Sequence, residues 1–492
     1  MKKVIKVIVK CMLFLCVLAA VIGKTASVVE RKESDSKFTD FYKHPEEFDV
    51  LFFGTSHVLR GIFPMELWND YGIVSYNMSN NAETLAETYW VLKNTLNYSS
   101  PELVVIDLYK IPLNEKISRD EETGELLKEY LHDYMDSLPL SVTKIQAVWD
   151  LLPPGDRMEF LFDFSMYHER WSVLGQGDFE PAKSLEKGAG SYAGIVSTTG
   201  PEALSTDVRN EEHTLGKDYL EKMIELCQER GIEVLLTYIP YGEISEEDRS
   251  WANSGYTIAE KYKIAYANML EEEGLIHYQI DCSDSDSHLN VSGGRKVTEY
   301  LGAYVTEHYH IPDRRNQAEY AAWFGDYQEY MEEKLQALSQ EADLYKYLLL
   351  LRDQSLSCCC YIRAGSRIYE DELAVELLHN IGADERLEEA RKNNEDYLVL
   401  FDNFDAQVYE FVGDETFENN VRFGLFEYYV DENGEKQLHI EDSADNYLTD
   451  SRERPSDLHV LVFDNADGEM VDKARFIMTE SMNRKEIKKQ AD

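Results

Sequence analysis

Residues 48–57 read FDVLFFGTSH, and this stretch decides the fold of the first half of the chain. A short apolar run ends at Gly54, and a serine and a histidine follow within three residues. A short apolar run of this kind is typical of a strand buried on both faces of a parallel sheet. Glycine permits a tight turn, so the hydroxyl of Ser56 can project from the edge of that sheet. A serine that caps the following helix is the simpler alternative.

Further apolar runs alternate with segments of helical spacing, which predicts an α/β fold built on a parallel sheet. The apolar runs lie at 72–78, 102–109, 232–239 and 275–281, and the helical segments at 84–96, 217–230, 258–272 and 293–308. Such sheets bind ligands beyond the carboxyl ends of their strands. This rule places four polar segments along one edge: 54–57, 77–81, 107–109 and 283–290.

The composition excludes some classes of protein. The chain has 492 residues, with 49 Lys or Arg against 93 Asp or Glu, so its formal charge is −44. This charge argues against a nucleic-acid binder, because phosphate recognition needs a basic surface. Hydrophobic residues make up 43% and aromatic residues 12%, which is enough for packed cores. The length predicts two or three domains.

Residues 1–32 differ from the rest of the chain. Four lysines among the first ten residues precede an unbroken apolar run at 11–23, and the first acidic residue is Glu30. This arrangement is typical of an export signal. We interpret the segment as a basic cytoplasmic stub and a signal-anchor helix, with the body of a single-pass protein outside the cell membrane. A cleaved signal peptide, which would make the protein secreted, is the close alternative.

A second chemical motif follows the last predicted strand, where residues 284–290 read DSDSHLN. A serine nucleophile needs a base within hydrogen-bond reach, and the base needs a carboxylate that orients it. His288 is the candidate base for Ser56, and Asp284 or Asp286 can orient it. A histidine in a polar loop is the simpler interpretation of His288 alone, but the pair of motifs is much more specific.

Together these motifs resemble the SGNH/GDSL hydrolase family, in particular its membrane-anchored members that act on cell-surface polymers. Those members include the D-alanyl-lipoteichoic acid biosynthesis and alginate O-acetylation proteins. The similar segments are GTSH (54–57), IFP (62–64), YN (76–77), PELVVID (101–107) and HLNVSG (288–293). The resemblance covers about residues 45–312. It implies a flavodoxin-like three-layer sandwich and serine ester chemistry, with Ser56 as nucleophile and His288 as base.

One departure from the family concerns the oxyanion site. The family's third block, Gly-x-Asn-Asp, is absent, and DLY (107–109) stands in its place. The remaining candidates for oxyanion donors are the backbone N–H of Ser56 and the side chains of Asn77, Asn80 and Asn81.

A second departure concerns the orienting acid. The family's aspartate three residues before the histidine is Ser285 here. Asp286 or Asp284 must take that role, and the Asp-x-His spacing of some alginate-acetylation relatives favours Asp286. Candidate substrate-binding residues are His57, His168 and Trp171, the last two in an aromatic and charged segment that can stack on a sugar.

The remaining chain adds an insertion, a long helix and a second domain. An irregular stretch at about 110–213 interrupts the SGNH-like domain of residues 45–312. Apolar residues three or four apart predict one long amphipathic helix at 313–352. Residues 355–480 predict a smaller α+β domain with hairpins at 423–440 and 458–476. Its cysteine triplet, 358–360, is expected to be buried in a strand.

These expectations point to an extracytoplasmic, membrane-anchored serine esterase or O-acyltransferase. Its substrate would be a cell-surface polysaccharide or another acylated polymer. By resemblance, a multipass membrane O-acyltransferase is a candidate partner. No metal or other cofactor is expected. The alternative is a catalytically inactive protein of the same fold that binds glycans or acts as a scaffold in an envelope modification complex. The polymer, the acyl group and the choice between hydrolysis and transfer stay open.

Overall fold

A computed structural model provides the coordinates. The described residues are 2–29, 36–44, 48–120, 123–161, 167–179, 183–198, 206–283, 288–441, 445–449, 455–481 and 484–489. The chain divides into two compact units. The first comprises Met1–Ser191, Gly200–Ile276 and Lys296–Phe324, and the second comprises Tyr192–Thr199, His277–Arg295 and Gly325–Asp492.

The chain begins with one long apolar helix, α1 (Lys2–Val29). Its segment Val4–Ala26 has 23 residues and is long and apolar enough to cross a membrane. A single-pass anchor and a signal sequence both have this length and composition. Val29, at the end of α1, is buried, whereas the side chains described between Val4 and Thr25 are exposed.

A five-stranded parallel sheet forms the centre of the first unit, which confirms the predicted α/β class. The strand order is β2-β1-β3-β4-β5. The strands are β1 (Val50–Phe53), β2 (Ser75–Asn77), β3 (Leu103–Asp107), β4 (Glu233–Tyr238) and β5 (Ala265–Asn268). Leu51 of β1 pairs with Tyr76 on one side and with Val104 on the other. Every residue of β1, β2 and β3 is buried, as expected for a parallel sheet with both faces covered.

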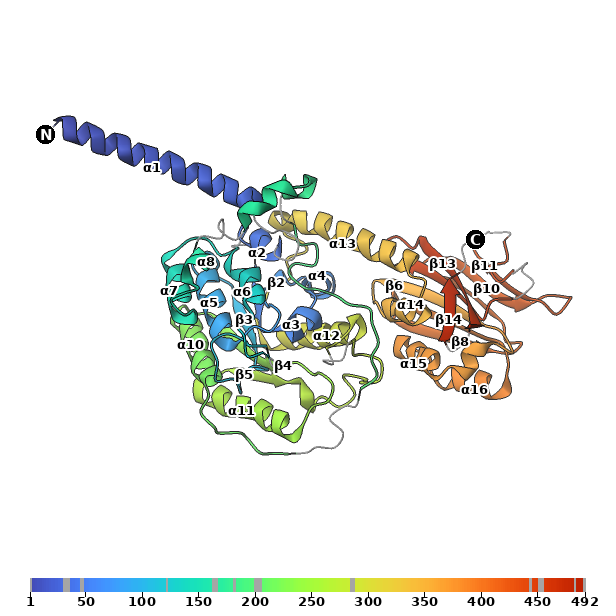
Figure 1. Cartoon of the computed structure of the whole chain (residues 1–492). Helices are drawn as coiled ribbons and strands as arrows, with labels where there is room; N and C mark the ends of the chain where they lie inside the picture. Colours follow the sequence, from blue (N-terminus) through green and yellow to red (C-terminus); the bar gives the residue numbers. More distant parts are fainter. Residues whose placement is uncertain are drawn as a thin grey trace. The chain divides into compact units, whose positions relative to one another are not determined.

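Helices cover both faces of this sheet (Figure 1). One face carries α5 (Leu85–Thr95) and α10 (Leu215–Glu229), which meet where Tyr89 packs edge-on against Tyr219. The other face carries α3 (Ser56–Gly61), α4 (Pro64–Tyr71) and α12 (Val291–His308). On that face, Thr298 of α12 accepts a hydrogen bond from the backbone N–H of Phe63. The remaining helices are α2 (Ser36–Phe41), α6 (Lys128–Met135), α7 (Val142–Leu151), α8 (Arg157–Leu161) and α11 (Glu246–Tyr262).

The predicted strand at 275–281 is wrong. The fifth strand is β5, which pairs with β4, and 275–281 forms turns. The helix expected at 258–272 is also wrong: α11 (Glu246–Tyr262) ends where Lys263 adopts a left-handed conformation, and β5 and the 3-10 helix η3 (Met269–Glu271) follow it. The edge strand β5 reads AYAN, and so short a strand of small and polar residues carries little hydrophobic periodicity.

The second unit contains two antiparallel sheets, which confirms the α+β character expected for the C-terminal part. The larger sheet has the order β14-β13-β12-β6-β7-β8 and the smaller has β11-β10-β9. The strands are β6 (Leu356–Ile362), β7 (Tyr397–Asp402), β8 (Gln407–Val412), β9 (Phe417–Val421), β10 (Gly424–Val430), β11 (Lys436–Ile440), β12 (Leu458–Asp464), β13 (Met470–Ser481) and β14 (Arg484–Lys489). Its helices include α15 (Glu372–Ile381) and α16 (Glu385–Asn393).

Both predicted hairpins are present, as β10–β11 and β12–β13. The cysteine triplet is buried in β6, and all seven cysteines are free thiols. The prediction of a single long helix at 313–352 is wrong. This segment forms two helices, α13 (Ala321–Gln340) and α14 (Leu344–Leu351). They are separate because Asp343 leaves the helical conformation, and its side chain accepts a hydrogen bond from the N–H of Lys346.

Candidate functional site

The sheet has a topological switch point between β1 and β3. The chain moves from β1 to β2 in one direction and then crosses to β3, β4 and β5 in the other. In doubly wound sheets, ligands bind at the carboxyl ends of the two strands where this order reverses. Here those ends lead to the turn at Gly54 and to Asp107. The strand order therefore places the GTSH motif at the position in this fold that most often holds a ligand.

Ser56 is the first residue of α3, directly after the turn that follows β1. Thr55 caps this helix, since its hydroxyl accepts a hydrogen bond from the N–H of His57. The capping role that is the simpler interpretation of Ser56 therefore belongs to Thr55. Ser56 is half-buried. A half-exposed hydroxyl at a strand-to-helix turn is the placement that a serine nucleophile needs.

Gly54 permits this turn because its neighbours leave no room for a side chain. A Cβ atom at this position would overlap Cγ2 of Val58 and would lie 3.0 Å from Cβ of Asp107. The backbone at Gly54 therefore lies in close contact with the first turn of α3 and the end of β3. A larger residue here would displace the backbone that carries Ser56.

Asn77 holds the far end of α3. Its side-chain amide donates hydrogen bonds to the carbonyls of Val58 (2.8 Å) and Ile62 (3.1 Å). Its amide oxygen accepts from the N–H of Ser79. Both amide hydrogens of Asn77 are therefore committed to the backbone around α3, which makes Asn77 a positioning residue for Ser56 in this structure.

The other two asparagines are bound less completely. Asn80 is buried and its amide donates to the carbonyl of Tyr130 at 2.8 Å, while its backbone N–H donates to the carbonyl of Gly54. Asn81 is half-buried in the turn that follows. Asn80 and Asn81 therefore stay candidates for oxyanion donors.

We expect Asn77→Ala to lower the free energy of unfolding of the first unit by about 2–4 kcal/mol, because four hydrogen bonds of a buried side chain are lost. The matched variant Asn80→Ala loses one side-chain hydrogen bond, so its expected loss is about 1 kcal/mol. Urea unfolding followed by tryptophan fluorescence is the measurement. All six tryptophans lie in the first unit, so their emission reports on it alone. Equal losses in the two variants would contradict the positioning role.

Asp107 is a buried carboxylate at the same edge, and sequence reasoning gave it no role. Its oxygens accept hydrogen bonds from the N–H groups of Ile239 (2.9 Å) and Tyr109 (3.1 Å). Burial nevertheless raises the pKa of Asp107 to about 7, because desolvation of the charge outweighs these hydrogen bonds. The sequence shows that Asp107 stands where the family's third block would be, but it does not show that Asp107 is buried.

The raised pKa of Asp107 predicts a pH dependence of stability. Between about pH 4 and pH 7 the folded state holds the Asp107 proton while the unfolded chain has released it, so stability falls as the pH rises through this window. Asp107→Asn should remove the part of this loss that falls between pH 5 and pH 8, which is about 3 kcal/mol. The measurement is urea unfolding at pH 5 and pH 8, followed by tryptophan fluorescence. If the free energy of unfolding changes equally between pH 5 and pH 8 in the variant and in the wild type, Asp107 does not cause this pH dependence.

His57 packs into an aromatic cluster behind the turn. Its ring centroid lies 4.0 Å from that of Tyr109 and 4.8 Å from that of Tyr241, and His57 is buried. The two tyrosine rings meet edge to face at 5.1 Å. These three rings join the segments that follow β1, β3 and β4. The cluster gives His57 a packing role beside Ser56, and a role in substrate binding stays a prediction.

His288 belongs to the second unit, in a loop that ends at α12. Its carbonyl accepts hydrogen bonds from the N–H of Ser283 (2.7 Å) and from the Ser283 hydroxyl (3.1 Å). Asn290 caps α12, since its amide oxygen accepts from the N–H groups of Ser292 and Gly293. The carbonyl of His288 and the backbone that follows it are thus fixed. Asp284 and Asp286 lie outside the described residues.

The loop before α12 also depends on Asp281. The Asp281 carboxylate accepts hydrogen bonds from the N–H of His277 and from the hydroxyl of Ser292, both at 2.8 Å. A Cβ atom at Gly293 would lie 2.7 Å from the Asp281 carbonyl. The HLNVSG motif therefore runs from the end of this loop into the first turn of α12, and its Asn290 and Ser292 side chains hold the backbone that follows His288.

The other candidate residues come from the insertion, and not from the carboxyl edge of the sheet. His168 and Trp171 lie on the 3-10 helix η1 (His168–Ser172), and both are exposed. A role for them in sugar binding stays a prediction. Among the residues that the structure describes, no three His, Cys, Asp or Glu side chains are grouped as metal ligands.

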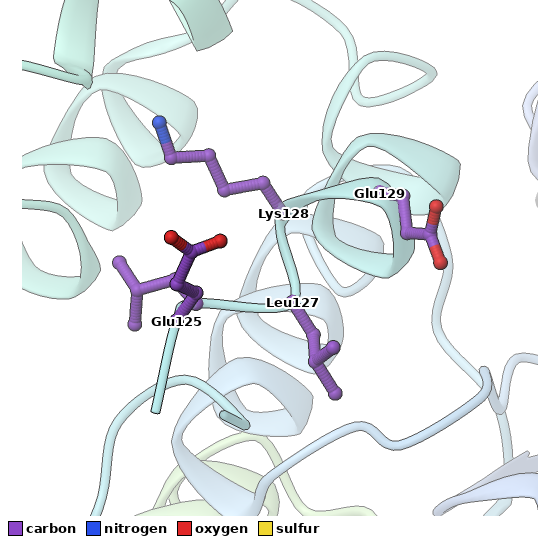
Figure 2. A pocket seen from close by; sticks show the side chains of 5 residues that line it. Glu125, Leu127, Lys128 and Glu129 are labelled. Atoms are coloured by element: carbon purple, nitrogen blue, oxygen red, sulfur yellow. The ribbon is translucent and has the colours of Figure 1, made fainter. Parts of the chain in front are cut away.

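The insertion also carries a cavity of about 600 Å³ lined by residues 125–129 (Figure 2). Lys128 forms ion pairs with Asp156 (2.6 Å) and Glu159 (3.5 Å) beside it. Glu159 also contacts the ring of His132; burial lowers the pKa of that histidine, but Asp136 and, to a smaller extent, Glu159 outweigh it and raise the pKa. None of the cavity's residues belongs to the predicted site.

Comparisons with known proteins add little. No protein-family model matches the sequence, and no curated protein matches it. One similar solved structure is that of a "putative acylhydrolase" from Bacteroides fragilis, at 12% identity, covering 57% of this chain and 97% of that one. The TM-score of that match is 0.26. A score this low does not establish a common fold, so the α/β class rests on the sheet itself.

Proposed function

We propose that the protein is a membrane-anchored, extracytoplasmic serine esterase or O-acyltransferase of the SGNH type. The observation that carries this proposal is the position of Ser56. It is the first residue of α3, at the carboxyl end of β1 and next to the switch point with β3. The likeness of the GTSH and HLNVSG motifs to the family's blocks supplies the choice of chemistry.

In the proposed reaction, Ser56 Oγ attacks the acyl carbon of an ester while His288 takes its proton. The alcohol leaves with that proton, and an acyl-serine remains. Water or a polysaccharide hydroxyl then attacks the acyl group and gives its proton to His288, which passes a proton to Ser56 Oγ as the acyl–serine bond breaks. Asp286 or Asp284 would orient His288. The backbone N–H of Ser56 and the amides of Asn80 and Asn81 are the proposed donors to the oxyanion.

The helix α1 supports a location at the membrane, where an acylated polymer of the cell surface would be within reach. On this proposal the acyl group would come from a multipass membrane O-acyltransferase or from the polymer itself. The net charge of −44 does not suit an anionic polymer such as a teichoic acid backbone, so a neutral polysaccharide is the preferred substrate class.

The test is intact mass spectrometry of the full chain after reaction with a fluorophosphonate, which modifies activated serines. We expect one adduct, located on the tryptic peptide of residues 44–60, in which Ser56 is the one serine. An unmodified, folded protein would contradict an activated serine and would favour a binding or scaffolding function. An adduct on another peptide would contradict the assignment of Ser56.

A further inference from the structure

Three large apolar side chains are exposed together on a short segment of the insertion. Trp171 is 72% exposed, Val173 71% and Phe179 66%. They lie on and between η1 and a second 3-10 helix, η2 (Gln176–Phe179). A group of exposed apolar side chains of this size is typical of an interaction surface.

This segment is fixed to the end of α1. The guanidinium of Arg170 donates a hydrogen bond to the carbonyl of Val29 at 2.7 Å. It also forms an ion pair with Asp178 at 2.9 Å, and the other oxygen of Asp178 accepts from the N–H of Gly175. One arginine thus joins η1, η2 and the last residue of α1. In Figure 1 the segment, drawn in green, lies beside the end of α1.

The height of this segment above a membrane follows from the helix geometry. The 23 residues of Val4–Ala26 rise about 34 Å, which is slightly more than a hydrocarbon core of about 30 Å. Val29 lies three residues further on, or about 4.5 Å. The polar headgroup layer on each side of a bilayer is roughly 5–7 Å thick. A residue bonded to Val29 therefore lies at the level of the lipid headgroups.

We propose that Trp171, Val173 and Phe179 form a membrane-docking surface that inserts into the interface of the bilayer spanned by α1. Tryptophan prefers this level of a membrane, because its ring is apolar and its N–H is polar. The surface does not depend on anionic lipid, since the exposed Glu169 and the net charge of −44 would oppose it. Docking would hold the first unit against the membrane, whereas without it the unit would be attached through α1 alone.

The test uses the full chain reconstituted in phosphatidylcholine vesicles, with flotation to confirm that it is bound. Brominated acyl chains quench tryptophans that enter the bilayer interface. Four of the six tryptophans are buried, and the two exposed ones are Trp171 and Trp149, the latter 51% exposed on α7. We expect brominated phosphatidylcholine to quench wild-type emission, and Trp171→Phe to reduce that quenching at least twofold. The matched variant Trp149→Phe should retain it.

Two further outcomes decide the inference. Val173→Ser combined with Phe179→Ser should reduce the quenching at least twofold, with an unchanged circular dichroism spectrum. Quenching that survives Trp171→Phe, or that disappears in Trp149→Phe alone, would overturn the inference. The fluorophosphonate reaction of the same samples separates this surface from the proposed function, because docking does not require an activated serine.

Discussion

Replacement of Ser56 by alanine should remove nearly all of the kcat/KM for a soluble acyl ester, such as p-nitrophenyl acetate. The expected loss is about 10⁴-fold or more, since the acyl-serine can no longer form and only binding and oxyanion contacts remain. The folded structure should be unaffected. Ser56 is half-buried, and the cap of α3 is made by Thr55. The measurement is the initial rate at several ester concentrations.

The control for Ser56 is Ser250→Ala. Ser250 lies on α11 in the same unit, is only partly exposed, and its hydroxyl donates to the carbonyl of Glu247 within its own helix. This variant should keep the wild-type rate. A Ser56→Ala protein that is folded and retains more than a tenth of the wild-type rate would exclude Ser56 as the nucleophile.

His288→Ala should lower the same rate by about 10²–10⁴-fold, which is the usual contribution of a positioned general base. The expected change is mainly in kcat, because the histidine acts on the proton of Ser56 and not on substrate binding. The fluorophosphonate reaction should slow by a similar factor, since it depends on the same activation. The stability should change little, because the backbone of the loop is held by Ser283 and Asn290.

The matched variant is His213→Ala. His213 is exposed, and its ring contacts Asp218 at 2.9 Å, so it offers the same type of histidine–carboxylate pair away from the predicted site. Its rate should equal that of the wild type. A His288→Ala protein with an unchanged pH-rate profile would show that another group, or none, serves as the base.

The separate variants Asp286→Asn and Asp284→Asn extend this test. The one that reproduces most of the loss seen in His288→Ala identifies the orienting carboxylate, since loss of that group leaves the imidazole in the wrong tautomer. Equal, small effects would favour a Ser–His dyad.

The class of the fold could be predicted from the sequence because its strands are continuous apolar runs. The apolar residues at 50–53 and 103–106 can be recognised without tertiary context, since only a strand covered on both faces is apolar on both faces. The hairpins β10–β11 and β12–β13 could be predicted for a different local reason: polar turn residues separate two short strand-like segments. The edge strand β5 and the break at Asp343 could not, since neither has a strong periodic signal.

The sequence by itself predicted which residue types would carry the proposed chemistry. Gly54, Ser56 and His288 stand in motifs whose spacing is specific, and that information is local. Only the tertiary structure decided the roles of the groups around them. Asn77 had the same standing in the sequence as Asn80, but its amide is committed to two carbonyls around α3. Asp107 acquires its raised pKa from burial beneath neighbouring strands. Hydrogen-bond partners and desolvation depend on segments far apart in the chain, which no local pattern encodes.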